Sequence, residues 1–154
     1  MKTSEQITNF LSHKNIAVVG VSRNPQTNVG NAIYKKFKNA GYNVYQVNPS
    51  ADEINGEKCY RSLSSTPEKV EAAFLTTHPQ KSLDAVKECA GNGIKQVWFH
   101  RAFGDGSYSK EAEDFCKENG IDAITYGCPM MYVKPVDFGH KCIRFFMKLG
   151  GKLS

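Results

Sequence analysis

The stretch that decides the fold is IAVVGVSRNPQTNVG, which runs from Ile16 to Gly30. Its apolar start predicts a buried strand, and the polar segment behind it predicts a loop that leads into a helix. Backbone N–H groups in such a loop and at the start of a helix bind phosphate groups well. The sequence therefore predicts an anion-binding loop at 20–28, with a strand-to-helix turn that holds no ligand as the simpler alternative.

Four more apolar runs follow, and amphipathic segments separate them. Strands that alternate with helices need crossover connections, which are right-handed and place helices on both faces of a sheet. The pattern therefore predicts an α/β protein with a single doubly wound, mostly parallel, five-stranded Rossmann-like sheet. We expect strands at 16–20, 43–47, 72–76, 96–99 and 122–125, and helices at 29–40, 79–90, 109–120 and 137–149.

Composition narrows the class of protein. A chain of 154 residues with 40% hydrophobic and 23% charged residues predicts one globular domain, 1–154. Residues 1–15 contain no continuous apolar run, so we expect neither a signal peptide nor a membrane span, and a cytoplasmic protein. The five cysteines include no C-x-x-C pair and the four histidines lack ligand spacing, so we expect reduced thiols and no metal site.

The formal net charge of +5 indicates a partner of opposite charge. The basic residues are dispersed, and dense segments such as YKKFK at 34–38 have the helical spacing of a solvated helix face. They form neither a recognition helix nor an aromatic platform for bases, so we expect no nucleic-acid partner. A polyanionic small molecule, held by backbone donors and a few cations, explains the charge.

The loop is not a nicotinamide-dinucleotide fingerprint. That fingerprint places G-x-G-x-x-G after the first strand and an Asp or Glu at the end of the second strand. Here Gly20 is followed by no further glycine until Gly30, and the second strand ends in Val47-Asn48-Pro49, without an acid. Both parts of the fingerprint are absent, although the longer polar loop, with Ser22 and Arg23, can still hold a pyrophosphate.

Four motifs in a fixed order carry a resemblance to a known family. They are IAVVGVSRNP at 16–25, GYNVYQVNPSADEINGEKCYRSL at 41–63, VWFH at 97–100 and GCPMMY at 127–132. The chain resembles the small CoA-binding proteins of the Rossmann type, which look like stand-alone versions of the CoA-binding domain of succinyl-CoA synthetase and of ADP-forming acyl-CoA synthetases. The resemblance covers a core of 13–135 and implies that the protein binds coenzyme A or an acyl-CoA.

The resemblance also implies which loops meet the ligand. The glycine loop meets the phosphates, the V-N-P corner lies near the adenosine, the third loop covers a helix N-terminus, and the last is a Cys-Pro turn. Two positions depart from the pattern, because the run Phe99-His100-Arg101 follows the V-W pair where many relatives have Gln, and Gly127 replaces a polar residue. The implied cofactor-binding residues are Gly20, Val21, Ser22, Arg23, Asn24, Asn48, Pro49, Thr77, His78, Pro79, Cys128 and Pro129.

Cys128 leaves three hypotheses open. Its thiol forms a mixed disulfide with CoA, acts as a catalytic nucleophile, or packs structurally in a proline turn, and the last is favoured. No nucleophile with its base is evident, so we expect a ligand-binding protein without catalytic residues. A CoA-dependent or acyl-CoA-dependent enzyme and a redox or metabolite sensor that uses Cys128 are the alternatives.

Residues 136–154 predict a final amphipathic helix with Phe138, Ile143, Phe146 and Met147 on a broad apolar face. This face completes the core or supports a homodimer, and completion of the core is favoured. The expected partners are therefore a small-molecule CoA ligand and, beyond it, a second copy of the chain or an unknown protein.

Overall fold

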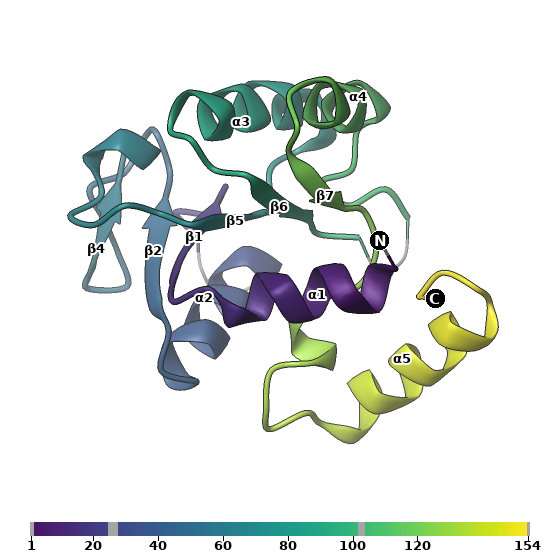
Figure 1. Ribbon diagram of the computed structural model, residues 1–154. Coiled ribbons are helices and arrows are strands. Elements are labelled where there is room, and N and C mark those ends of the chain that lie inside the picture. Colours follow the sequence, from purple (N-terminus) through teal and green to yellow (C-terminus); the bar gives the residue numbers. More distant parts are fainter. Residues whose placement is uncertain (1, 25–27, 102–103, 154) are drawn as a thin grey trace.

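The structure is a computed structural model that describes residues 2–24, 28–101 and 104–153 (Figure 1). Seven strands form one sheet in the order β3-β4-β2-β1-β5-β6-β7. The strands are β1 (Asn15–Val19), β2 (Asn43–Val47), β3 (Glu53–Ile54), β4 (Glu57–Tyr60), β5 (Ala72–Leu75), β6 (Gln96–Phe99) and β7 (Asp122–Ile124). The helices are α1 (Thr3–Ser12), α2 (Val29–Asn39), α3 (Pro79–Gly91), α4 (Lys110–Glu118) and α5 (Phe138–Leu149), with 3₁₀ turns η1 (Leu63–Ser65) and η2 (Pro129–Met131).

The predicted α/β class and mostly parallel sheet are confirmed, but the predicted number of five strands is wrong. Across the sheet, the neighbouring strands in the order β4-β2-β1-β5-β6-β7 are all paired in parallel. At the edge, β3 and β4 form an antiparallel hairpin. The hairpin turns through Asn55 and Gly56, whose φ angles are 56° and 74°. An Asn-Gly pair is the strongest short-range hairpin signal, because both residues accept positive φ. The sequence analysis placed Asn55 in a loop and so overlooked that signal.

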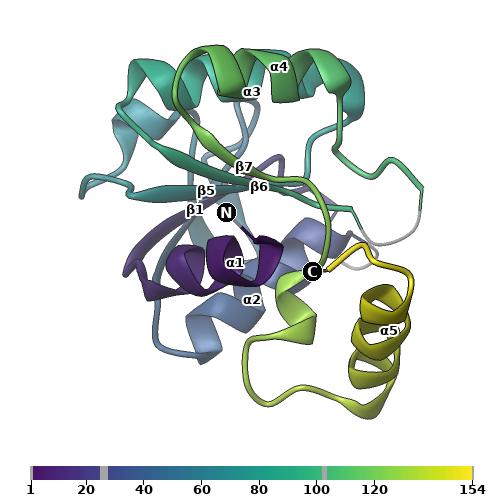
Figure 2. The same cartoon turned by 45° about the vertical axis from the view of Figure 1, so that its right-hand side comes forward.

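Helices cover both faces of the sheet, as Figures 1 and 2 show, with α3 and α4 on one face and α1 and α2 on the other. Alternate side chains of β1 supply the two cores. Ile16 and Val18 belong to the cluster beneath α1 and α2, whereas Ala17 and Val19 belong to the cluster beneath α3 and α4. A strand that is buried on both faces has a continuous apolar run, which is why this segment was recognisable in the sequence.

Helix α1 was not predicted. It contributes Ile7 and Phe10, which are 2% and 0% exposed, to the core beside β6 and β7. Together with the half-buried Leu11, they recur at the i, i+3, i+4 spacing of one helix face. The sequence of this helix is polar overall, because only this narrow stripe is apolar. The helix could have been recognised from the spacing of its apolar residues rather than from its composition.

The order in which the strands are added to the sheet reverses at β1. From β1 the chain moves outward through β2 and β4 on one side, and then returns to place β5 on the other side of β1. Helix α2 leaves β1 toward one face, and α3 leaves β5 toward the opposite face. Connections that diverge in this way open a crevice at the carboxyl ends of the two strands, which is where ligands bind in doubly wound sheets.

Helix α5 is less buried than expected. Met147 is 6% exposed and Ile143 packs against the core, but Phe138 and Phe146, which were predicted on the same apolar face, are 81% and 68% exposed. Figure 2 shows α5 beside the α1–α2 layer rather than over the sheet. Among the helices of the described residues, none is both long enough and apolar enough to cross a membrane.

Candidate functional site

The loop after β1 is pressed against the loop after β5. The backbone N–H of Gly20 donates to the carbonyl of Val47 (3.0 Å), and the N–H of Thr76 donates to the carbonyl of Val19 (2.8 Å). Gly20 has a φ of 92°, and a Cβ atom added to it would lie 2.8 Å from the backbone nitrogen of Thr77. Any side chain at this position therefore forces the two loops apart.

One buried amide holds the next part of this loop. The side chain of Asn31, 9% exposed on α2, accepts the backbone N–H of Ser22 (2.9 Å) and donates to its carbonyl (2.9 Å). The N–H of Asn24 donates to the Ser22 hydroxyl (3.0 Å). The Ser22 N–H is thus committed within the protein, and the Ser22 O–H keeps its own proton for a ligand. The sequence analysis missed Asn31, which lies behind the predicted loop.

The remaining predicted residues of this loop differ in exposure. Val21 is 1% exposed and belongs to the core, whereas the side chains of Arg23 and Asn24 are exposed. In residues 2–24 and 28–101, no acceptor is paired with the backbone N–H of Val21 or Arg23. Residues 25–27, the middle of the predicted loop, lie outside the described residues.

The start of α2 lies at the same edge of the sheet. Asn28 caps the helix, since its side chain accepts the backbone N–H of Gly30 (2.9 Å). Gly30 is buried, and an added Cβ atom would collide with the hydroxyl of Thr76. The N-terminus of α2 therefore lies directly against the end of β5, at the point where the strand order reverses.

The V-N-P corner supports the loop after β1 from the side. The side-chain amide of Asn48 donates to the carbonyl of Val21 (2.8 Å), and its oxygen accepts the backbone N–H of Ser50 (2.8 Å). The backbone N–H of Asn48 donates to the carbonyl of Tyr60 on β4 (2.9 Å). Asn48 therefore braces three segments, while Pro49 is exposed beside it.

The loop after β5 leads into α3. His78 caps this helix, with its Nδ1 accepting the backbone N–H of Gln80 (3.4 Å), and Pro79 is the first helical residue. The Thr77 hydroxyl shares a hydrogen bond with the hydroxyl of Ser82 (2.8 Å). As predicted from the sequence, these residues lie at a helix N-terminus, and the exposed His78 ring faces solvent there.

The fourth and fifth loops are joined by Arg101. Its guanidinium carbon lies 4.1 Å from the ring centroid of Tyr108 and 4.5 Å from that of Tyr126. The backbone N–H of Gly127 donates to the Arg101 carbonyl (2.8 Å), so a short bridge links the two loops. A guanidinium between two aromatic faces is held in place by cation–π attraction. Arg101 is therefore a structural connector that the sequence analysis did not assign.

His100 is half-buried at this junction. Its ring packs edge-on against Phe74 at a centroid distance of 6.2 Å, and burial lowers the pKa of its imidazole. A neutral ring fits this apolar position, because a charged one would lose its hydration.

Cys128 is buried among core residues. Its side chain is 4% exposed, and burial raises the pKa of its thiol to about 11. Pro129 follows it as the first residue of η2, and the Cys128 carbonyl accepts the backbone N–H of Met131 (2.9 Å). The thiolate is the reactive form of cysteine, so these features favour the packing role over a nucleophile or a disulfide partner.

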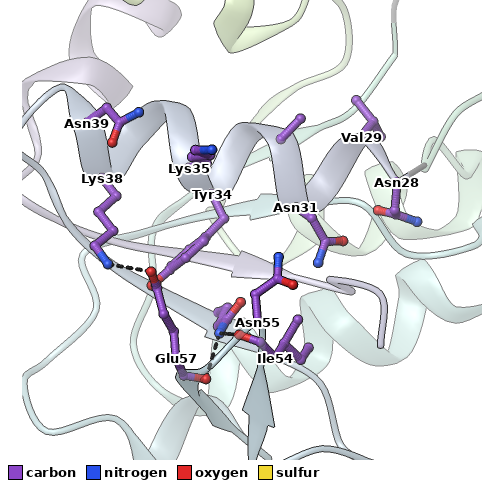
Figure 3. A pocket seen from close by; sticks show the side chains of 12 residues that line it. Asn28, Val29, Asn31, Tyr34, Lys35, Lys38, Asn39, Ile54, Asn55 and Glu57 are labelled. Carbon is purple, nitrogen blue, oxygen red and sulfur yellow. Dashed lines mark hydrogen bonds and ion pairs between the residues drawn. The ribbon is translucent and has the colours of Figure 1, made fainter. Parts of the chain in front are cut away.

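A groove of about 760 Å³ runs along α2 beside the β3–β4 hairpin (Figure 3). At one end lies Asn28, the cap of α2, and at the other Glu57 accepts hydrogen bonds from the Tyr34 hydroxyl (2.6 Å) and the Lys38 ammonium (2.6 Å). Gln46, 2% exposed, forms part of its floor. The sequence analysis missed this groove, which depends on the unpredicted hairpin for one wall.

Within the described ranges, no group of three or more His, Cys, Asp or Glu side chains could hold a metal ion.

Comparison with known proteins agrees with this geometry. The family described as a CoA binding domain matches residues 14–134. The chain is 32% identical over 119 residues to an ADP-forming acetate–CoA ligase of Methanocaldococcus jannaschii, covering 75% of this chain and 17% of that protein. It is 31% identical to the alpha subunit of ADP-forming acetate–CoA ligase II of Pyrococcus furiosus, covering 77% of this chain and 26% of that subunit.

A solved structure of a hypothetical protein from Pyrococcus horikoshii OT3 is similar over most of both chains. The sequence identity is 30%, the TM-score is 0.72, and the alignment covers 83% of this chain and 87% of that one. The chain therefore has the size of that small protein, whereas it spans about a quarter or less of the ligases it matches. The match over residues 14–134 shows that the chain belongs to the CoA-binding domain family.

Proposed function

We propose that this protein binds coenzyme A or an acyl-CoA at the carboxyl edge of its sheet, and that binding is its whole biochemical activity. The observation that carries the proposal is the bracing of the loop after β1. Asn31 and Asn48 hold this loop from two sides, and Gly20 brings it within contact of the loop after β5. A loop fixed before the ligand arrives binds phosphate groups without a further ordering cost.

The pyrophosphate lies over the loop after β1 in this proposal. The backbone N–H groups of Val21 and Arg23, the Ser22 hydroxyl and the Arg23 guanidinium are its donors, and Asn24 borders it. The start of α2 adds the positive end of a helix dipole. Gly20 contributes by the space it leaves rather than by a contact.

The other predicted residues shape the two ends of the site. Asn48 and Pro49 form a rigid corner for the adenosine, with the Asn48 amide acting through Val21 rather than on the ligand. Thr77, His78 and Pro79 offer a second helix N-terminus toward the pantetheine side. Cys128 and Pro129 close the far end of the edge by packing.

The enzyme and sensor alternatives gain no support from Cys128. A nucleophilic cysteine needs a lowered pKa and an adjacent base, whereas burial raises the pKa of this thiol to about 11. All five cysteines are free thiols, and four of them are buried. Free thiols persist in a reducing compartment, which supports our placement of the protein in the cytoplasm.

A homodimer or a contact with another protein would form at α5 in this proposal. Phe138, Phe145, Phe146 and Leu149 expose 59–81% of their surface there, and exposed apolar side chains that cluster mark interaction surfaces. Sedimentation velocity of the wild-type protein and of Phe146→Lys tests the homodimer. A dimer that the substitution disrupts supports it, and a monomeric wild-type protein contradicts it.

Calorimetric titration of the reduced protein tests the central claim. We expect CoA and acetyl-CoA to bind, and NAD to bind at least about tenfold more weakly, because the ribose corner lacks the acid of the NAD fingerprint. The affinity for CoA should fall between about 50 mM and about 300 mM salt, since phosphate contacts are screened. Tight binding of NAD with none of CoA would overturn the proposal.

A further inference from the structure

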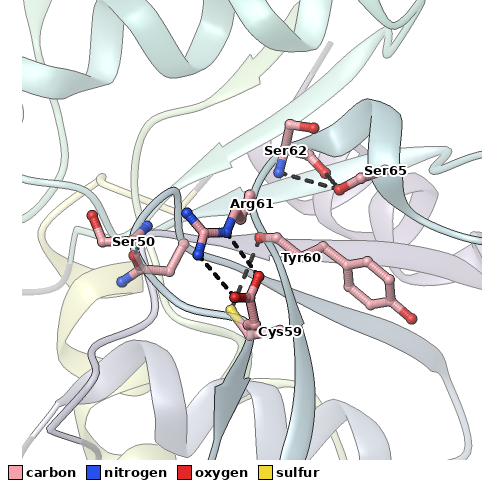
Figure 4. A network of polar contacts seen from close by, with 8 residues as sticks. Ser50, Cys59, Tyr60, Arg61, Ser62 and Ser65 are labelled. Carbon is pink, nitrogen blue, oxygen red and sulfur yellow. Dashed lines mark hydrogen bonds and ion pairs between the residues drawn. The ribbon is translucent and has the colours of Figure 1, made fainter.

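A bidentate ion pair stands at the carboxyl end of β4, beside the V-N-P corner (Figure 4). The Nε and Nη2 atoms of Arg61 donate to the two carboxylate oxygens of Asp52, at 2.7 Å and 2.8 Å. The carbonyl of Tyr60, the residue before Arg61, accepts the backbone N–H of Asn48 (2.9 Å). Arg61 is therefore level with the corner that follows β2, although 13 positions separate it from Asn48 in the sequence.

The corner itself supplies no positive charge. Residues 48–52 are Asn, Pro, Ser, Ala and Asp, so the only charged side chain within that segment is the carboxylate of Asp52. The Arg61 hydrogen bond lowers the pKa of this carboxyl group, which keeps it ionised near neutral pH. Arg61 directly follows β4 and is oriented by its hydrogen bonds to Asp52, whereas Lys58 on β4 acts on this carboxyl group only through its charge.

The pair is open to solvent and has donors to spare. The side chains of Arg61 and Asp52 are 59% and 64% exposed, so the attraction between them is weak and a competing anion can share or replace it. A guanidinium has five N–H donors, and Asp52 occupies two of them. The exposed Ser50 and the half-buried Ser62 follow β2 and β4 at the same edge, and the Ser62 hydroxyl shares a hydrogen bond with the hydroxyl of Ser64 (3.0 Å).

We propose that Arg61 binds the 3′-phosphate of CoA and that Asp52 opposes this contact, so that the pair sets the selectivity for a 3′-phosphorylated nucleotide. This inference rests on the proposed function, and it adds the group that distinguishes CoA from its nearest analogue. Residues at the end of the second strand meet the adenosine ribose in Rossmann-type sheets. A phosphate on that ribose then lies next to Arg61, whose planar fork matches phosphate oxygens.

The test compares CoA with 3′-dephospho-CoA by calorimetry, in the wild-type protein and in Arg61→Ala and Asp52→Asn. We expect the wild-type protein to prefer CoA by about tenfold, the size of one charge-assisted contact. Arg61→Ala should remove this preference by weakening CoA alone. Asp52→Asn should strengthen CoA binding by about threefold and leave dephospho-CoA unchanged, because a competing carboxylate is removed.

Two further variants test whether the changes in affinity are specific to Arg61 and Asp52. Lys110→Ala removes the cation of an exposed ion pair with Asp114 on α4, and it should change neither affinity. In the double variant Asp52→Asn/Arg61→Ala, CoA and dephospho-CoA should bind with equal affinity, because neither charge of the pair remains beside the 3′-phosphate.

The outcomes separate the two proposals. If neither CoA nor dephospho-CoA binds the wild-type protein, the proposed function is wrong. If both bind with equal affinity, or if Arg61→Ala weakens both equally, CoA binding stands and the role of Arg61 is wrong.

Discussion

The two halves of the candidate site are built in different ways. In the loop after β1, the contacts are buried or made by backbone atoms: Gly20 lies against Thr77, and one amide of Asn31 holds both backbone groups of Ser22. In the corner after β2 and β4, Arg61 and Asp52 meet as exposed side chains. The buried contacts hold the loop after β1 in one arrangement. In the corner, the exposed ion pair of Arg61 and Asp52 can be replaced by a contact with another charged group at little cost in free energy.

Under the proposed function, this difference gives different tasks to the two halves. A rigid loop fixes where a phosphate binds, because its donors are oriented before the ligand arrives. An exposed ion pair discriminates between ligands, because its energy depends on whether the ligand brings a charge. Substitutions in the loop should therefore weaken all CoA analogues together, while those in the corner should change selectivity.

Gly20→Val should have the largest effect on binding. The new Cβ would lie 2.8 Å from the backbone nitrogen of Thr77 at a φ of 92°, so the loops must separate. We expect CoA affinity to fall by about a hundredfold or more, with a lower unfolding temperature, both from the strained backbone. Calorimetry and thermal unfolding measure the two effects. The control is Gly91→Ala, where an added Cβ has open space; a similar loss there would show that any glycine substitution is harmful.

Cys128 should react about a hundredfold more slowly than an unperturbed thiol near neutral pH, because burial raises its pKa from 9.0 to about 11. Raising the pH toward 11 deprotonates the thiol, so the rate should increase about tenfold per pH unit. Mass spectrometry after iodoacetamide treatment follows this residue beside the half-buried Cys142, with Cys128→Ser identifying the modified peptide. Fast modification of Cys128 at pH 7 would reopen the sensor and enzyme alternatives.

Asn31→Ala should weaken CoA and dephospho-CoA equally, by about tenfold, and lower the free energy of unfolding by about 1–3 kcal/mol. The substitution leaves the N–H and the carbonyl of Ser22 without their buried partner. Asn39→Ala, at an exposed position near the other end of α2, is the matched control. A selective loss for CoA would contradict the division between the rigid loop and the discriminating corner.

Ser22→Ala should have the smallest effect, a loss of about threefold in CoA affinity at unchanged selectivity. Its hydroxyl offers one donor to a phosphate, and it also accepts the N–H of Asn24. Calorimetry with both nucleotides measures the change. An effect as large as that of Asn31→Ala would indicate that the hydroxyl, rather than the braced backbone, dominates phosphate binding.

Much of the fold could be predicted from local patterns. The five contiguous strands from β2 to the edge strand β7 and the helices between them were evident, because buried parallel strands have apolar runs and the helices have caps and glycine stops. Helix α1 and the β3–β4 hairpin were missed, although both have local signals. These are the i, i+3, i+4 spacing around Ile7 and Phe10, and the Asn55-Gly56 turn.

The candidate site was less predictable than the fold. The loops that carry it were identified, because they follow strands at a known edge of the sheet and contain Gly, Pro, Ser and Asn. The roles within them were not. Asn48, predicted as a ligand contact, donates its side-chain amide to the carbonyl of Val21, while Asn31 and Arg61, on which our proposals depend, were not among the predicted residues.

The sequence by itself determined which segments become strands and helices and which loops follow them, because periodicity, caps and turn residues act between near neighbours in the chain. Only the tertiary structure decided which side chains remain exposed at the edge of the sheet and which hold the loops. The bond from Asn48 to Val21 and the approach of Arg61 to the corner depend on the order β4-β2-β1-β5. That order brings distant residues together through the packing of the whole sheet, and no local pattern records it.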